Sequence, residues 1–242
     1  MNTSAFSVID VAALSYVGSV VVDEPEKGAG GIWNLACTEK NLFVIHSGTH
    51  EVSVIDHPAL RKKLESYPQK ENLSYDLHFL YGIRKRVQLE GNGPRLLYLR
   101  GNELLVPTYF ADVLNKVDIN TLSVTSVNMN PGRVESKENA GERFFNDATQ
   151  CFQGWQSCNG CHPGDARTDG MNWDLMNDGV GNAKNCKSML YSHVTAPSMI
   201  SGIRETAEWA VRAGFKFIQF YDVQEENAQC VDAYLKSLRP VP

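Results

Sequence analysis

The chain has no apolar segment long enough to cross a bilayer and no excess of positive charge. Its longest apolar stretch, residues 8–22, is interrupted by Asp10, Ser15 and Ser19, whereas a membrane helix needs about 18 or more consecutive apolar residues. Proteins that bind nucleic acid by neutralising phosphates are normally basic, but the formal net charge here is −5. The sequence therefore predicts a globular protein with no membrane span and no nucleic-acid partner.

A recognisable secretion signal is also missing. Residues 1–10 contain no Lys or Arg, and no apolar segment with a small-residue cleavage site follows them. Taken alone, this absence favours the cytoplasm. Gly and Pro are too few, at 19 and 10 residues, for a collagen-like or low-complexity chain. The 6 cysteines are likewise too few for a disulfide scaffold of this length.

The first half of the chain repeats a short pattern. Ser-Val-Ile-Asp at residues 7–10 recurs at residues 53–56, and Lys-Val-Asp at residues 116–118 is a weaker third copy. We expect the aspartate that ends each copy to cap a turn. Short β-forming runs separated by turn residues surround these copies; they are residues 32–37, 42–45, 51–55, 96–99 and 103–106. No catalytic set is found in this half.

One of these segments, KNLFVIHSGTHEVSVID at residues 40–56, resembles the strand–turn–strand segment of bacterial YVTN-type β-propeller repeats. The resemblance implies that residues 1–132 form a partial propeller of two to three blades, with an insertion at about residues 60–90. A closed propeller needs about four to eight blades, so we expect the chain to be a fragment of a longer protein. A plain β-sandwich or meander is the alternative.

One motif in the second half indicates a specific chemistry. Cys158, Cys161 and His162 form the C-x-x-C-H pattern by which c-type haem is attached. Two thiols three residues apart on a helical turn can form thioethers with the porphyrin vinyl groups, and the adjacent imidazole can bind the iron as proximal ligand. The cysteine pair could instead be a redox dithiol, or half of a zinc site completed by Cys186 and Cys230. We expect one covalent haem c.

The flanks of this motif resemble the opening of the haem domains in bacterial di-haem cytochrome c peroxidases and their methylamine-utilisation relatives. The likeness lies in GERFFND, SCNGCH and TDG, which follow one another in residues 141–170. It implies an all-α cytochrome c-like haem domain over residues 137–242, so the expected fold class is a partial β-propeller followed by an all-α domain. Those peroxidases carry two haem domains. Because this chain has a single C-x-x-C-H, we expect a second haem domain outside it.

A distal iron ligand is expected among the methionines after the motif, which are Met171, Met176, Met189 and Met199. Met199 follows a rigid Ala-Pro step and falls where the resembling families have their distal-side loop, so it is the predicted ligand. His193 is the alternative, and an open coordination position is a third possibility. Cys186 and Cys230 could form a disulfide, although sequence does not fix the pairing.

The predicted function is electron transfer through a His/Met-ligated haem to a redox partner protein. A saturated iron excludes peroxide, so the alternative is a peroxidase-like oxidoreductase in which the longer protein supplies a second haem domain and reduces hydrogen peroxide. A third possibility is a binding module with a tethered haem domain. Because haem c is attached outside the bacterial cytoplasm, the motif predicts a periplasmic or extracellular location despite the missing signal peptide.

Overall fold

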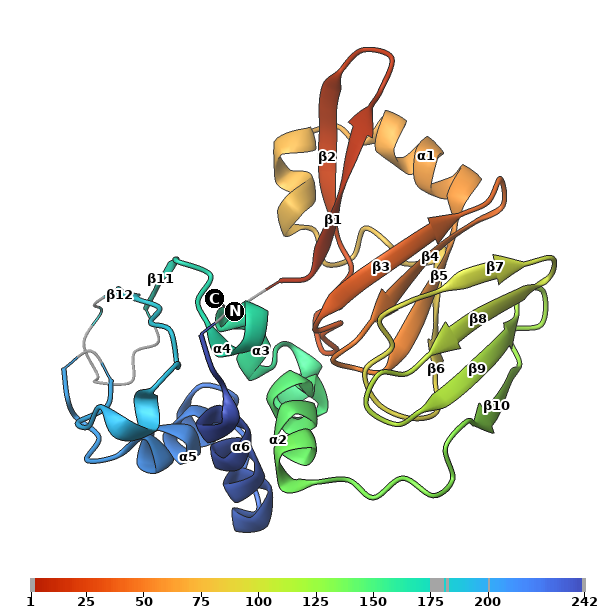
Figure 1. The fold of residues 1–242 in the computed structure, drawn as a ribbon. Helices are drawn as coiled ribbons and strands as arrows, with labels where there is room; N and C mark the ends of the chain where they lie inside the picture. The colour runs from red at the N-terminus through yellow and green to blue at the C-terminus, as the bar shows by residue number, and fades with distance from the viewer. Residues whose placement is uncertain (1–2, 175–180, 182, 200, 241–242) are drawn as a thin grey trace. The chain divides into compact units, whose positions relative to one another are not determined.

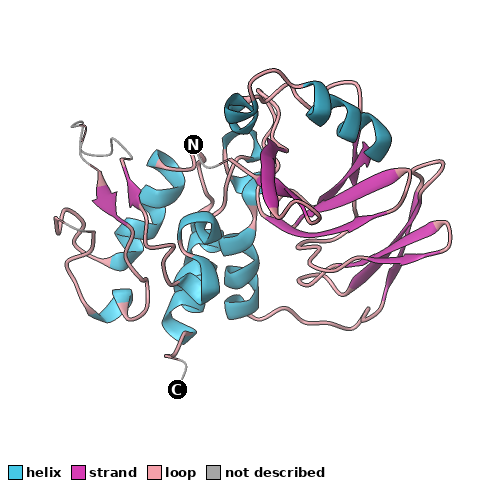
Figure 2. Ribbon diagram, turned by 90° about the horizontal axis from the view of Figure 1, so that it is seen from above, coloured by secondary structure: helices cyan, strands magenta, loops and turns pink. Residues whose placement is uncertain are grey.

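The computed structural model describes residues 3–174, 181, 183–199 and 201–240. The chain divides into two compact units, Met1–Pro131 and Gly132–Pro242. Figure 1 traces the strands of the first unit and the helices of the second along the chain, and Figure 2 separates helices from strands by colour. In the described part of the chain, no helix has both the length and the apolar composition needed to cross a membrane.

The N-terminal unit is built from antiparallel sheets. A hairpin comes first, formed by β1 (Ala5–Asp10) and β2 (Ser15–Val21). One four-stranded sheet contains β3 (Ile32–Cys37), β4 (Asn41–His46), β5 (Glu51–Asp56) and β6 (Arg84–Gln88). The other contains β7 (Tyr98–Arg100), β8 (Glu103–Pro107), β9 (Val113–Asp118) and β10 (Val124–Asn128). Strand order follows chain order in both sheets, so each is a meander (Figure 1).

The first four-stranded sheet is covered on both faces. One face packs against the second sheet through buried apolar residues that include Phe43, Ile45 and Leu104. The other face packs against the hairpin and against the segment between β5 and β6, which forms α1 (His57–Ser66) and the 3-10 helix η1 (Lys70–Tyr75). This double burial explains why β4 contains the apolar run Leu42–Ile45, since strands covered on both faces lose the polar alternation. In β5, residues 51–55 are buried although Glu51 and Ser53 are polar.

The aspartates that end the three repeat copies cap turns, as predicted. The carboxylates of Asp10 and Asp118 each accept two backbone N–H bonds from the turn that follows, at 2.8 to 2.9 Å. Asp56 is the N-cap of α1 and accepts a hydrogen bond from the N–H of Ala59 at 2.8 Å. Capping of this kind ends each strand at the same point of the repeat.

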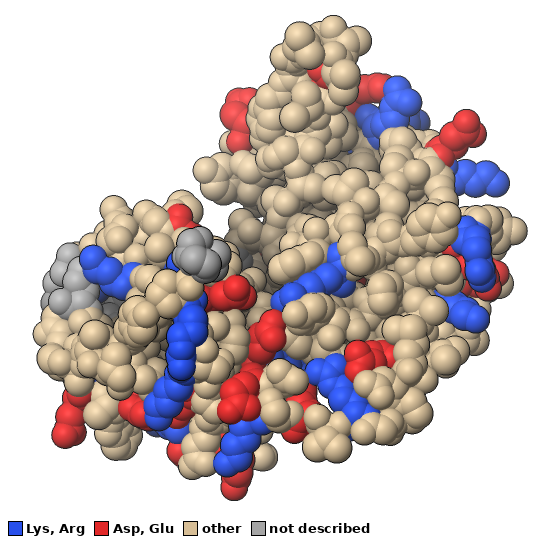
Figure 3. Space-filling model, in the orientation of Figure 1, with Lys and Arg blue, Asp and Glu red and all other residues tan. Residues whose placement is uncertain are grey.

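The outer end of the β1–β2 hairpin carries almost no charged side chains (Figure 3). Its large apolar residues are exposed; they are Ile9, Val11, Leu14 and Tyr16. Towards its base the hairpin contributes Phe6, Val20 and Val22 to the core of the unit.

The C-terminal unit is organised around three helices, α2 (Lys137–Asn146), α5 (Ala207–Phe217) and α6 (Glu225–Ser237). Ser136 caps α2 by accepting a hydrogen bond from the N–H of Asn139 at 3.2 Å. Shorter elements lie between them: η2 (Ala148–Gln150), η3 (Phe152–Gly154), α3 (Cys158–Cys161), α4 (Pro163–Ala166), β11 (Asn172–Trp173), β12 (Lys184–Asn185) and η4 (Ser192–Val194). The strands β11 and β12 pair as a two-stranded sheet.

Helices α2 and α6 pack closely against each other. The ring centroids of Phe145 on α2 and Tyr234 on α6 are 5.4 Å apart. A Cβ atom on Gly141 would lie only 1.9 Å from the carbonyl oxygen of Cys230, so glycine is required at this contact. The apolar face of α6 is buried here, and Val231 and Leu235 belong to the core of the unit.

The predicted fold class, a partial propeller followed by an all-α haem domain, is wrong. Over the described residues the chain forms four antiparallel sheets, two of four strands and two of two strands. The N-terminal sheets stack face to face instead of forming a ring, and the first repeat copy contributes only a hairpin. The C-terminal unit is not all-α because two extended segments pair as β11 and β12. The alternative of a meander describes each four-stranded sheet.

Candidate functional site

A cavity of about 570 Å³ lies in the C-terminal unit. Its volume is typical of sites that bury a small molecule or cofactor, at roughly 300–1,000 Å³. Much of the wall is apolar and comes from α2, α5, α6 and the segment after β12; it includes Phe145, Met189, Leu190, Ala210, Val211 and Val231. Cys158, Cys161 and His162 all line this cavity, so the whole C-x-x-C-H motif faces one space.

The two motif cysteines occupy a single turn of helix, α3. The N–H of His162 donates to the carbonyl oxygen of Cys158 at 3.0 Å and closes this turn. Cys158 is a free thiol in the structure. Burial raises the pKa of the Cys158 thiol to about 12, so this group is protonated at neutral pH. The turn therefore holds two sulfur atoms at the wall of the cavity.

The His162 ring is arranged as a neutral ligand. Burial lowers the pKa of its imidazole, which favours the uncharged form. Its Nδ1 lies 3.2 Å from the carbonyl oxygen of Arg167, which can accept a hydrogen bond from an Nδ1–H. A histidine held in this way keeps the lone pair of Nε2 for a metal ion, and the backbone partner fixes the ring orientation.

Cys186 lies beside the motif. Its Sγ donates to the carbonyl oxygen of Cys161 at 3.1 Å and lies 3.6 Å from Nδ1 of His162. Cys186 and Cys230 are both free thiols, so the disulfide considered from the sequence is not formed in the structure. Among the described residues, no group of three His, Cys, Asp or Glu side chains is arranged to hold a metal ion by itself. The geometry thus gives no support to a zinc site.

The two candidate distal ligands lie in different surroundings. Met199 lines the cavity at a turn closed by a bridge between Ser198 and Arg204, and it is 38% exposed. The His193 side chain is buried, with Nε2 3.1 Å from Oδ1 of Asp232 and Nδ1 3.3 Å from Oγ of Ser192. His193 is also absent from the described residues that line the cavity.

The other three methionines after the motif differ in whether they line the cavity. Met189 lines the cavity and packs against the apolar core of the C-terminal unit. Met171 is exposed. Met176 lies outside the described residues.

Two further residues at the cavity were missed in the sequence. Gln219 is 3% exposed, and its Nε2 donates to Sγ of Cys158 at 3.0 Å. Oε1 of Gln219 and Oγ of Ser198 are buried without a hydrogen-bond partner in the described part of the chain, and both residues line the cavity. No spacing pattern marks either residue, because folding alone brings them to the motif.

These features fit a covalently bound haem. Two thiols on one helical turn and an imidazole with an available nitrogen share a cavity with a largely apolar wall. Buried polar atoms are rarely left without partners in a native protein. The unpartnered oxygens of Ser198 and Gln219 are thus two polar atoms that a group in the cavity could contact.

No family model matches the chain, and no curated protein matches it. Among solved structures, it is similar to Kuenenia stuttgartiensis hydrazine synthase with 21% sequence identity and a TM-score of 0.41. The likeness covers 52% of this chain and 35% of that chain, so this sequence corresponds to well under half of its neighbour's length. A likeness this distant does not indicate a function.

Proposed function

We propose that this chain is a c-type haem protein that transfers electrons. Cys158 and Cys161 would carry one haem through thioether bonds, and His162 would be its proximal iron ligand. The observation that supports this proposal is the convergence of the complete C-x-x-C-H motif on one cavity of about 570 Å³. A bound haem c supplies an iron that alternates between ferrous and ferric states.

The residues of this chain would set the properties of that iron. The carbonyl oxygen of Arg167 orients the His162 ring, and burial of the ring favours its neutral form by lowering its pKa. The wall formed by residues such as Phe145 and Val211 limits access of water, and a dry surrounding stabilises the less charged ferrous state. A fixed His162 ring and an apolar wall would both favour repeated electron transfer without rearrangement of the site.

We also propose Met199 as the distal ligand. Met199 lines the same cavity as His162, whereas both ring nitrogens of His193 already have partners. A thioether ligand raises the reduction potential relative to a second histidine. If His162 and Met199 both bound the iron, the site would have no open position for hydrogen peroxide.

Location and partners follow from the same chemistry. Because haem c is attached outside the bacterial cytoplasm, we place this protein in the periplasm or outside the cell. Its electron partner would be a redox protein or a second haem domain.

The optical spectrum of the ferric protein, produced with the bacterial haem-attachment machinery, tests electron transfer against peroxidase chemistry. We expect a low-spin spectrum with a near-infrared sulfur-to-iron band and no change on addition of hydrogen peroxide. A high-spin spectrum that shifts with peroxide would show an open iron. That result would replace electron transfer with a peroxidase-like function.

A further inference from the structure

His193 is held against α6 by a buried hydrogen bond. Its side chain is 4% exposed, and its Nε2 lies 3.1 Å from Oδ1 of Asp232, whose side chain is 7% exposed. His193 belongs to η4, in the segment that leads to Met199. We infer that His193 is a positioning residue whose bond to Asp232 holds Met199 in place as the distal ligand. This inference rests on the proposed function, because Met199 is a ligand only if the chain carries a haem.

Asp232 is a fixed anchor point on α6. Its other oxygen, Oδ2, accepts a hydrogen bond from Nη1 of Arg212, which lies on α5. Arg212 also donates from Nη2 to Oε1 of Glu225, the first residue of α6, at 2.6 Å. Asp232 is thus joined both to its own helix and to α5. A segment bonded to Asp232 is therefore bonded to two helices that wall the cavity.

The residues after His193 form part of the cavity wall. Thr195, Ser198 and Met199 line the cavity, whereas His193 is absent from the described residues that do so. Where the wall is formed, the N–H of Ser198 donates to the carbonyl oxygen of Arg204 at 2.8 Å. The segment is therefore anchored at two places, on α6 before it reaches the cavity and at the bridge beside Met199.

The position of Met199 depends on these anchors. Its φ is 71°, in the left-handed region that residues other than glycine rarely adopt, and such strain persists only where the surrounding structure enforces it. Met199 is also 38% exposed, so packing holds it only in part. An extended chain spans about 3.3–3.6 Å per residue. Release of the His193 anchor would therefore let the sulfur move farther than a metal–ligand bond tolerates.

A competing ligand measures how firmly the sulfur is held. Each full chain is produced with the haem-attachment machinery, imidazole is added in steps to the ferric protein, and its dissociation constant is obtained from the loss of the near-infrared sulfur-to-iron band. His193→Leu removes the hydrogen bond to Asp232. His193→Gln is the conservative variant, since a carboxamide N–H can replace that of the ring. Phe144→Ala is the stability control, because Phe144 packs against the core of the same unit and does not line the cavity in the described structure.

His193→Leu should weaken the near-infrared band and tighten imidazole binding about ten- to a hundredfold, the range for loss of a hydrogen bond to a charged group. His193→Gln should restore most of the parent affinity. Phe144→Ala should lower the stability of the unit and keep the parent affinity for imidazole. Parent affinity in His193→Leu would overturn the inference. Equal tightening in Phe144→Ala would also overturn it, since any loosening of the unit would then release the ligand.

His193→Phe covers the case in which the leucine variant does not fold. It keeps a ring and lacks the N–H donor, so the same tightening of imidazole binding is expected. If the parent shows the sulfur band and His193→Phe keeps the parent affinity, this inference alone is contradicted. A haem-bearing parent without the band would contradict Met199 as ligand and this inference with it. A parent chain without covalent haem would contradict the proposed function itself.

Discussion

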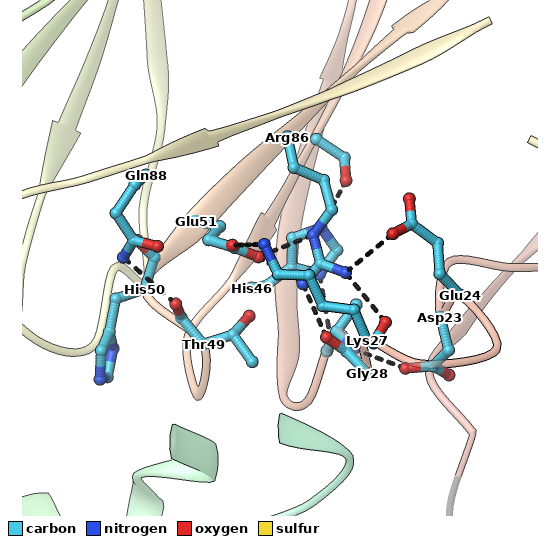
Figure 4. Close-up of polar contacts among 12 residues, drawn as sticks. Asp23, Glu24, Lys27, Gly28, His46, Thr49, His50, Glu51, Arg86 and Gln88 are labelled. Atoms are coloured by element: carbon cyan, nitrogen blue, oxygen red, sulfur yellow. Dashed lines mark hydrogen bonds and ion pairs between the residues drawn. The ribbon is translucent and has the colours of Figure 1, made fainter. Parts of the chain in front are cut away.

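His46 lies in the interior of the N-terminal unit at 0% exposure. Its Nδ1 is 3.2 Å from the carbonyl oxygen of Ala29, and its Nε2 is 2.8 Å from Oγ of Ser53. Figure 4 shows the ring beside a buried ion cluster in which Glu51 pairs with Arg86 and Lys27. Burial, together with nearby positive charges such as that of Arg86, lowers the pKa of His46 to about 3.

This histidine should make the unit less stable in acid. In the unfolded chain a histidine has a pKa of about 6.5, so above that pH His46 is neutral in both states and contributes no pH dependence. As the pH falls from 6.5 towards 3, the unfolded state binds a proton that the folded state does not. The free energy of unfolding should then fall by up to about 1.4 kcal/mol per pH unit.

Urea unfolding of the parent, His46→Gln and His78→Gln at pH 7 and pH 4.5 tests this prediction. His46→Gln should reduce the difference in unfolding free energy between the two pH values, because the group that titrates is gone. His78 is exposed, so His78→Gln should retain the full difference. Equal pH dependence in all three proteins would show that His46 does not control acid stability.

Met199 gives the residue-scale prediction for the candidate site. Met199→Ala should abolish the near-infrared band of the ferric protein, because the proposed sulfur ligand is removed. Met171→Ala is the matched control, since Met171 follows the same motif but is not among the described residues that line the cavity. The near-infrared absorption of the two ferric variants, compared at equal haem content, tests this prediction. A band that survives in Met199→Ala would exclude this residue as the ligand.

Residues of the candidate site differed in how visible they were in the sequence. Cys158, Cys161 and His162 were identified because attachment chemistry fixes their spacing within one helical turn. Gln219 was not assigned to the site, and Cys186 was considered only as a zinc ligand or disulfide partner, because their contacts with the motif depend on tertiary folding. A short sequence motif predicts only the arrangement of residues that are close together in the chain. It does not report which distant side chain will lie against a given sulfur.

At the scale of elements, the contact of α2 with α6 depends on Gly141. A Cβ atom there would lie 1.9 Å from the carbonyl oxygen of Cys230 and 2.5 Å from its carbonyl carbon. Real side chains do not tolerate such distances, so the helices would have to separate. This separation would also disturb the contact of Phe145 with Tyr234.

Gly141→Ala should therefore lower the free energy of unfolding of the C-terminal unit by about 1–3 kcal/mol or more, the usual cost of overpacking. Gly132→Ala is the control, because an added Cβ there meets nothing within 4 Å. That change should be neutral or stabilising by up to about 1 kcal/mol. Thermal unfolding followed by circular dichroism provides the comparison. A stable Gly141→Ala would contradict the close contact.

Element positions were largely predictable. Runs of β-forming residues gave strands within a few residues of their observed limits, as at β3, β5 and β8. Helix α5 spans Ala207–Phe217. Thr206 caps α5 by accepting a hydrogen bond from the N–H of Trp209 at 3.4 Å, so the cap sets the true start. The paired segments β11 and β12 had no alternation to mark them, because each has only 2 residues.

At the scale of the whole molecule, the two units have separate cores. Leu104 is fully buried between the two sheets of the N-terminal unit, and Phe215 is buried beside the cavity helices of the C-terminal unit. The sequence predicted the strands of the first unit but not how its sheets associate. Sheet stacking depends on complementary faces that no short repeat encodes, and this explains the wrong propeller prediction.

Core substitutions in the two units should therefore have separate consequences. Leu104→Ala should destabilise the N-terminal unit by about 2–5 kcal/mol and leave the haem content per chain unchanged. Phe215→Ala should cost a comparable amount, about 3–5 kcal/mol, and lower the haem content. Calorimetry and haem absorbance on the same samples test both statements. Equal loss of haem in the two variants would show that the units do not act separately.

The mass of the intact chain after denaturation tests the central claim most directly. The protein is produced with the haem-attachment machinery, unfolded in acid and measured without digestion. We predict a mass increased by that of one haem, which returns to the mass of the chain alone when Cys158 and Cys161 are both replaced by alanine. A parent chain that releases its haem on unfolding, or never carries one, would contradict the proposal that Cys158, Cys161 and His162 form a haem c site.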